Sequence, residues 1–142
     1  MRILFDTNVV LDVLLNRRPY AESAAQLFVS VERKQMEGLL SATTVTTLHY
    51  LAAKKAIGAT RAKRHLETLL TLFDVAPVDK EVLAAALSLD FRDYEDAVLH
   101  EAGRRAGAAA IVTRDREGFR KGRMRVYEPH ELVKAIACLP VD

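Results

Sequence analysis

The spacing of hydrophobic residues changes repeatedly along the chain. Short runs that are apolar throughout alternate with longer stretches in which apolar residues recur at helical spacing. The apolar runs predict strands at residues 2–5, 39–42, 73–75, 108–113 and 125–127. The stretches between and around them predict helices at residues 9–15, 20–35, about 43–55, 60–72, 79–89 and 93–106, with a closing helix that begins at Pro129.

Capping and breaking residues indicate where several of these helices begin and end. Thr43 or Thr44 is expected to cap the third helix, and Asp79 is expected to cap the fifth. Gly38 is expected to stop the second helix, and Gly107 stands where a left-handed glycine closes the helix at 93–106. Strands and helices therefore alternate, and several strands are apolar throughout, which indicates a parallel sheet covered on both faces.

Length and composition exclude several classes of protein. The 142 residues fit one domain spanning 1–142; half are hydrophobic and 28% are charged, unlike a disordered or collagen-like chain. No apolar run reaches the ~18 residues of a membrane span, and the start of the chain lacks a signal-peptide cleavage site. The single cysteine, Cys138, excludes an intramolecular disulfide and a cysteine-based zinc site, which fits a reducing cytoplasm. The four histidines show no metal-ligand spacing, and the net charge of +2 neither requires nor excludes a nucleic-acid partner.

Polar residues with useful chemistry follow the predicted strands. Asp6 follows the first strand, Thr113 and Asp115 follow the fourth, and Asp93 and Asp96 open the helix before it. Because ligands bind outside the carboxyl ends of parallel strands, these carboxylates are expected to meet in one cleft. Like charges raise each other's pKa, and a divalent cation with oxygen ligands would offset that cost, activate a water and stabilise a phosphoryl transition state.

Three stretches resemble the PIN domain, the nuclease fold used by VapC-type toxins: DTNVV at 6–10, DYEDAVL at 93–99 and IVTRDREGF at 111–119. Each motif is weak alone, but their order on this strand–helix alternation is fairly specific, and the resemblance covers essentially the whole chain. It implies an α/β fold, a three-layer α/β/α sandwich with a central, mostly parallel sheet of four to five strands. It also implies metal-dependent cleavage of RNA by an acidic cluster.

The resemblance assigns roles to individual residues. Asp6, Asp96 and Asp115 match the family's metal-binding acids, and the implied cofactor is Mg²⁺ or Mn²⁺. Asp93 matches an additional catalytic acid found in part of the family. Asn8 matches the polar partner beside the first aspartate. In the third motif, Thr113 matches the threonine that precedes the acid at 115.

One position departs from the family pattern. Many members carry a glutamate on the helix after the second strand, whereas Thr47 occupies that place here. Threonine can hold a metal-bound water but brings no charge, so activity is affected more than fold. Asp93 could compensate for the missing carboxylate.

Basic residues concentrate beside Asp115. Three of them, Arg114, Arg116 and Arg120, are interpreted as contacts to the RNA backbone, with an ordinary solvated loop as the alternative. The chain has no tryptophan and no basic motif interleaved with aromatics, so base-stacking recognition is not supported.

The leading hypothesis is a Mg²⁺- or Mn²⁺-dependent ribonuclease that acts on RNA, binds a small antitoxin protein, forms a homodimer and lies in the cytoplasm, away from membranes. The first alternative is a catalytically silent PIN-like module that binds RNA or protein. A haloacid-dehalogenase-like phosphatase would need an aspartate where Asn8 stands. A receiver domain would use a strand-three aspartate as phosphoacceptor and a lysine after the last strand, but Asp74 lies inside the third strand and no lysine closely follows the fifth. No glycine-rich loop supports nucleotide binding.

Each acid also has a purely structural interpretation. Asp6 could cap the following helix. Asp93 and Asp96 resemble a capping box at a helix N-terminus, and Asp115 could be a turn residue or an ion-pair partner.

Overall fold

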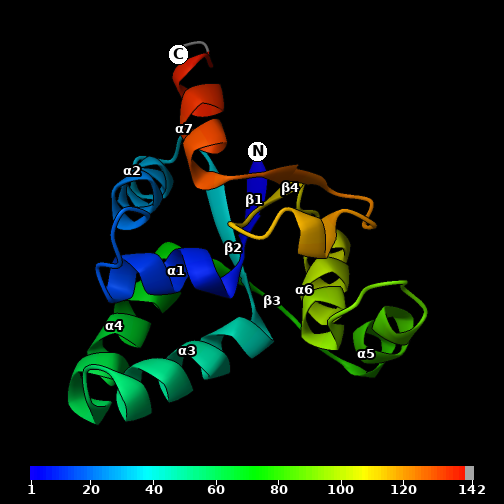
Figure 1. The fold of residues 1–142 in the computed structure, drawn as a ribbon, viewed down its shortest axis with the longest axis horizontal. Helices are drawn as coiled ribbons and strands as arrows, with labels where there is room; N and C mark the ends of the chain where they lie inside the picture. Colours follow the sequence, from blue (N-terminus) through cyan, green and yellow to red (C-terminus); the bar gives the residue numbers. More distant parts are fainter. Residues whose placement is uncertain (140–142) are drawn as a thin grey trace.

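The computed structural model describes residues 1–139 and arranges them as a sheet with helices on both sides (Figure 1). The five strands of this part of the chain are β1 (Arg2–Phe5), β2 (Glu37–Ser41), β3 (Asp74–Ala76), β4 (Ala110–Val112) and β5 (Arg125–Tyr127). Its helices are α1 (Thr7–Leu14), α2 (Ala21–Glu32), α3 (Ala42–Lys55), α4 (Ala59–Leu72), α5 (Lys80–Leu87), α6 (Tyr94–Arg105), the short η1 (Glu117–Phe119) and α7 (Pro129–Ala137). Within residues 1–139 no helix is both long and apolar enough to span a membrane.

The sheet is parallel throughout and has the strand order β3-β2-β1-β4-β5. The central strand β1 pairs with β2 on one side and with β4 on the other, so that Ile3 lies opposite both Gly38 and Ala110. The chain builds the sheet outward from β1 in one direction and then returns to build it in the other. The point where this order reverses, between β1 and β4, is where open parallel sheets bind ligands.

Two hydrophobic cores, one on each face of the sheet, explain why the strands are apolar throughout. Ile3 and Phe5 of β1 belong to the core that α1, α2, α3, α4 and α7 cover. Leu4, which points to the opposite face, belongs to the core that α5 and α6 cover, and Figure 1 shows these two helices together on one side. The predicted three-layer α/β/α sandwich is confirmed, with five strands.

Two local predictions were wrong. The cap of α3 is Ser41, whose hydroxyl accepts the Thr43 N–H at 3.3 Å, so the helix begins before either predicted threonine cap. The second helix ends at Glu32, before a turn in which Lys34 has a φ of 60°, and Gly38 lies inside β2. No larger residue fits at position 38, because a Cβ there would lie 2.5 Å from the Phe73 ring.

The other two predicted helix signals are confirmed. The Asp79 carboxylate accepts the Val82 N–H at 2.9 Å at the start of α5. Gly107 has a φ of 84° just beyond the end of α6, in the left-handed region that favours glycine.

Candidate active site

Asp6 stands where β1 ends and α1 begins. Its N–H donates to the Val112 carbonyl at 3.0 Å, which holds the end of β1 beside β4. One carboxylate oxygen accepts the Thr7 N–H at 2.7 Å and caps α1, and the other accepts the Thr113 hydroxyl at 2.7 Å. Burial raises the pKa of Asp6; the bonds from Thr113 and Thr7 lower it, and the nearby Asp115 and Glu95 charges raise it further.

A single buried hydroxyl connects two of the predicted acids. Thr113 follows β4, donates to Asp6 and accepts the Asp115 N–H at 2.9 Å. Asp115 in turn accepts the Gly118 N–H at 3.1 Å, which closes a turn into η1. Thr113 therefore fixes the position of both acids, and this role needs a small side chain that can donate and accept at once.

Asp96 lies in the first turn of α6. Asp93 caps this helix by accepting the N–H groups of Glu95 and Asp96 at 2.8 and 3.3 Å. The Asp96 carboxylate itself accepts no hydrogen bond from residues 1–139. Burial, followed by the charges of Asp6, Asp93, Asp115 and Glu95, raises the pKa of Asp96 to about 7.

These acids line one pocket of about 360 Å³. It lies at the carboxyl ends of β1 and β4, as expected from the strand-end positions. Gly118 sits against two of the carboxylates: a Cβ there would lie 2.6 Å from an Asp115 oxygen and 3.2 Å from an Asp96 oxygen. The pocket contains all four acids that the sequence indicated: Asp6, Asp93, Asp96 and Asp115.

The chemistry of this pocket suits a hard divalent cation, because its donors are carboxylate oxygens. Burial is the main cause of the raised pKa of Asp6 and of Asp96, and a cation would offset the smaller part that comes from the neighbouring carboxylates. Within residues 1–139 no three His, Cys, Asp or Glu side chains already surround a common point at ligand distance. The acids fit such an ion by donor type and location.

One further acid, which the sequence analysis missed, belongs to this pocket. Glu95 lines it and accepts the Thr47 hydroxyl at 3.4 Å, so a carboxylate from α6 lies beside the position where α3 lacks one. Glu95 also contributes to the raised pKa of Asp6 and of Asp96. Its place in the DYED stretch is the sequence feature that could have indicated a role at the site. Only the placement of α3 beside α6 in the structure shows that Glu95 meets Thr47.

The three predicted RNA-contacting arginines occupy different places. Arg114 lines the acidic pocket and its guanidinium pairs with Asp12. The backbone N–H of Arg114 lies 3.5 Å from the Asn8 side-chain oxygen. Arg116 pairs with Glu131 and lines a separate cavity, which Arg120 also borders. Arg120 pairs with Glu117 and also borders a cavity with Asp96 and Asp115.

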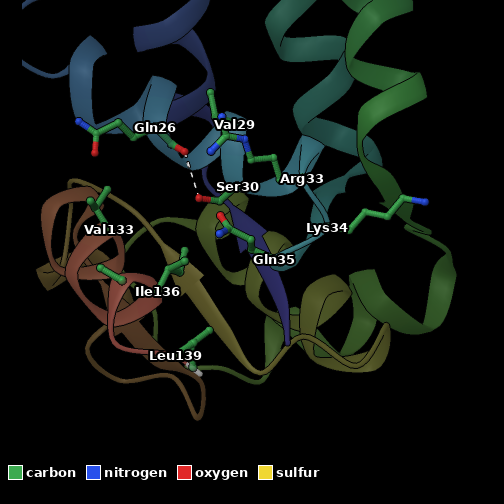
Figure 2. A pocket seen from close by; sticks show the side chains of 10 residues that line it. Gln26, Val29, Ser30, Arg33, Lys34, Gln35, Val133, Ile136 and Leu139 are labelled. Atoms are coloured by element: carbon green, nitrogen blue, oxygen red, sulfur yellow. Dashed lines mark hydrogen bonds between the residues drawn. The ribbon is translucent and has the colours of Figure 1, made fainter. Parts of the chain in front are cut away.

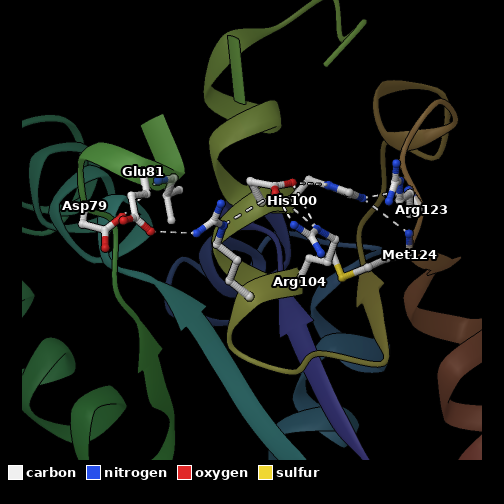
Figure 3. A network of polar contacts seen from close by, with 9 residues as sticks. Asp79, Glu81, His100, Arg104, Arg123 and Met124 are labelled. Atoms are coloured by element: carbon white, nitrogen blue, oxygen red, sulfur yellow. Dashed lines mark hydrogen bonds and ion pairs between the residues drawn. The ribbon is translucent and has the colours of Figure 1, made fainter. Parts of the chain in front are cut away.

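A buried histidine holds the loop that carries Asp115 against the helix that carries Asp96 (Figure 3). His100 Nε2 accepts the N–H groups of Arg123 and Met124 at 2.9 and 3.4 Å, so its proton resides on Nδ1, 3.7 Å from Glu101. Burial lowers the pKa of His100, which keeps the imidazole neutral and able to accept. His100 is thus a buried side chain that holds backbone rather than a ligand.

A larger cavity, of about 910 Å³, lies between α2 and α7 and shares no lining residue with the acidic pocket (Figure 2). Val29 and Ser30 line it from α2, and Val133 and Ile136 from α7. It contains no carboxylate. Chemistry rather than size therefore identifies the candidate active site.

Comparisons with known proteins place this geometry in a family context. "Ribonuclease VapC1" of Aquifex aeolicus (strain VF5) is 22% identical over 123 residues, covering 83% of this chain and 84% of the relative. A crystal structure of VapBC2 from Rickettsia felis, bound to a DNA fragment from their promoter, has a TM-score of 0.69 at 12% identity, covering 90% of this chain and 98% of that one. A toxin-antitoxin complex from Klebsiella pneumoniae has a TM-score of 0.68 at 21% identity, covering 91% and 98%.

The PIN domain profile matches residues 2–117, which include β1 through the start of η1 and every acid of the pocket. The match therefore covers most of the sheet and the whole acidic site. The chain belongs to the PIN domain family.

Proposed function

We propose that the protein is a ribonuclease that depends on Mg²⁺ or Mn²⁺. The observation that carries this proposal is the gathering of Asp6, Asp96 and Asp115 in one pocket at the reversal point of the sheet. These three carboxylates would hold the metal. When bound, a divalent cation lowers the pKa of a water and stabilises the charge of a phosphoryl transition state.

The remaining polar residues would prepare the site for that ion. Thr113 fixes Asp6 and Asp115 relative to each other, and Asn8 lies beside the same loop. Asp93 would assist by capping the helix that presents Asp96. Thr47 would orient Glu95, whose carboxylate supplies near α3 the charge that other family members place on that helix.

RNA would be held by its phosphate backbone. Arg114, Arg116 and Arg120 would contribute charge without reading bases, because phosphate contacts position a strand but carry little sequence information. Their different ion pairs imply different contributions, since Arg114 alone of the three lines the pocket with Asp6.

The named relatives support a place in a toxin–antitoxin pair. The Aquifex aeolicus relative is a ribonuclease and the Klebsiella pneumoniae structure is a toxin-antitoxin complex. We therefore propose a small antitoxin protein as partner, together with a homodimer. Co-expression with any small gene that lies beside this one tests the antitoxin proposal, since the two proteins should co-purify. The mass of the purified complex tests the homodimer.

A cleavage assay tests the enzymatic proposal. End-labelled RNA is incubated with the purified protein in Mn²⁺, in Mg²⁺ and in EDTA, and the products are separated on a gel. We expect cleavage in either metal and none in EDTA. Asp115→Asn should abolish cleavage, whereas the matched variant Asp74→Asn, at an exposed position on β3, should cleave as wild type does.

The second candidate function is a catalytically silent PIN module that binds RNA. The observation that favours it is Thr47, which leaves α3 without an acid at the pocket. RNA that is bound but remains intact in both metals would support this candidate and exclude the ribonuclease.

A further inference from the structure

A fully buried carboxylate on α1 holds two arginines from different parts of the chain. Asp12 has no exposed surface. One of its oxygens accepts Arg17 Nε at 2.8 Å and Arg114 Nη2 at 3.2 Å, and the other accepts Arg114 Nε at 2.7 Å. One carboxylate thus neutralises one guanidinium and leaves the group with a net charge of +1.

Further contacts hold both guanidinium groups in place beside the acidic pocket. Arg17 Nη2 donates to the Asn8 carbonyl at 3.1 Å, two residues after Asp6. The Arg114 guanidinium lies 4.0 Å from the centre of the Tyr20 ring, which holds it from the side through a cation–π contact. Both arginines line the same pocket as the catalytic candidates.

Each guanidinium keeps hydrogen-bonding capacity for a ligand. An arginine has five N–H donors, and the Nη1 group of Arg17 and of Arg114 finds no acceptor among residues 1–139. Their side chains are 39% and 28% exposed, respectively, although Asp12 beneath them is completely buried. The pair is therefore fixed on one side and open on the other.

The charge of the pocket indicates what this open side binds. Its lining includes five carboxylates, and the only cationic residues among those that line it are Arg17 and Arg114. An anionic phosphodiester that enters this pocket is repelled by the acids, and a metal ion offsets only part of that repulsion. A planar guanidinium fork matches two phosphate oxygens, and a pair of forks fixed in place adds orientation to attraction.

We propose that Arg17 and Arg114, oriented by the buried Asp12, form a phosphate-binding subsite that positions one phosphate of the RNA backbone at the acidic pocket. This inference rests on the proposed function and extends it by assigning Arg17 and Asp12, which had no role. It also separates Arg114 from the other basic residues of its loop. Asp12 is a positioning residue, since it acts through the two arginines.

Binding of RNA to single-arginine variants tests the subsite. The probe is a short fluorescein-labelled single-stranded RNA in Ca²⁺, with a gel to verify that it stays intact, and anisotropy gives Kd across a salt series. Arg17→Gln and Arg114→Gln each leave Asp12 with one guanidinium, so both should fold, which a thermal melt verifies. The matched control is Arg18→Gln, an exposed neighbour that borders a different cavity.

We expect Arg17→Gln and Arg114→Gln each to raise Kd about tenfold, the equivalent of one charge-assisted hydrogen bond. The slope of log Kd against log salt should become shallower by about 0.7 for each lost phosphate contact. Arg18→Gln should keep the wild-type Kd. Folded variants whose Kd and slope match those of Arg18→Gln would overturn the subsite.

The same experiment separates this inference from the proposed function. Wild-type protein that binds RNA through both arginines but never cleaves it in Mn²⁺ would support the subsite and refute the ribonuclease. Intact cleavage with unchanged Kd in both variants would refute the subsite alone. If the variants keep RNA binding but lose binding of a labelled oligoglutamate peptide, the arginines recognise a protein carboxylate and the phosphate assignment is wrong.

Discussion

Replacing Asp96 with asparagine should stabilise the metal-free protein. The Asp96 carboxylate accepts no hydrogen bond from residues 1–139, and its surroundings raise its pKa to about 7 from an ordinary value of 3.8. Ionising this side chain in the folded protein is therefore unfavourable. Asparagine keeps nearly the same shape without the charge, and no hydrogen bond to the side chain is lost.

The shift in pKa sets the size of the effect. A difference of about three pKa units corresponds to a ceiling of about 4 kcal/mol, at 1.36 kcal/mol for each unit. Asp96 is only partly buried, so solvent screening reduces the expected gain to about 2 kcal/mol. In a domain of this length that gain raises Tm by roughly 6 °C.

The pH dependence follows from the direction of the shift. A carboxyl with a raised pKa in the folded state costs no stability below its unfolded value near 4, and the cost grows as pH rises until it is complete above about 7. Thermal melts in EDTA should therefore show Asp96→Asn more stable than wild type at pH 8. The two proteins should melt together near pH 4.

Asp6→Asn provides a contrasting control. The Asp6 carboxylate also has a raised pKa, but it accepts the Thr7 N–H and the buried Thr113 hydroxyl, and asparagine retains only one acceptor oxygen. We expect this variant to melt at or below the wild-type temperature. An Asp96→Asn variant that melts below wild type in EDTA at pH 8, or whose advantage is the same at pH 4 and pH 8, would refute the assignment of Asp96 as a destabilising charge.

Substitutions at three further positions test other parts of the site. Gly118→Ala should leave Tm in EDTA nearly unchanged but reduce the rise in Tm that Mn²⁺ produces, because the new methyl displaces the Asp115 carboxylate. Calorimetric melts that show the same rise in Tm as wild type would contradict this. Asp12→Asn should lower the free energy of unfolding by about 3 kcal/mol in urea titrations, since it leaves two guanidinium groups with one weak acceptor; a loss below about 1 kcal/mol would contradict the buried pairing. His100→Leu should destabilise by about 2 kcal/mol and speed amide exchange at Arg123, whereas His100→Gln restores an acceptor. In wild type, stability should fall as pH drops below the ordinary histidine value of about 6.5, because folding lowers the pKa of His100. Equal amide protection factors at about pH 7.5 and pH 5.5, after correction for the pH dependence of intrinsic exchange, would contradict this.

Local residue patterns were sufficient to predict most of the fold. Apolar runs mark β1 and β5 with their observed bounds, and Asp79 and Gly107 act at the helix ends where they were expected. These features depend on neighbours within a few residues, through burial of both strand faces, side-chain capping and the left-handed conformation of glycine. The placement of Asp6 and Asp115 after two parallel strands also predicted that they would lie in one cleft, whereas the strand order itself comes from the structure.

Contacts between distant segments decided the rest. Gly38 was predicted from the sequence to end a helix. In the structure, glycine is required at this position because the Phe73 ring packs against β2 and leaves no room for a Cβ. Glu95 is an ordinary first-turn acid of α6 until α3 brings Thr47 beside it.

The arginines show most clearly that sequence pattern does not predict which distant side chains meet. Arg114 and Arg116 lie two residues apart in one basic stretch, but Arg114 joins Asp12 in the acidic pocket and Arg116 joins Glu131 elsewhere. The sequence determined which side chains follow each strand, because backbone pattern is local. Only the tertiary structure decided which charges face one another, because ion pairs form between elements whose distance along the chain is unrelated to their distance in space.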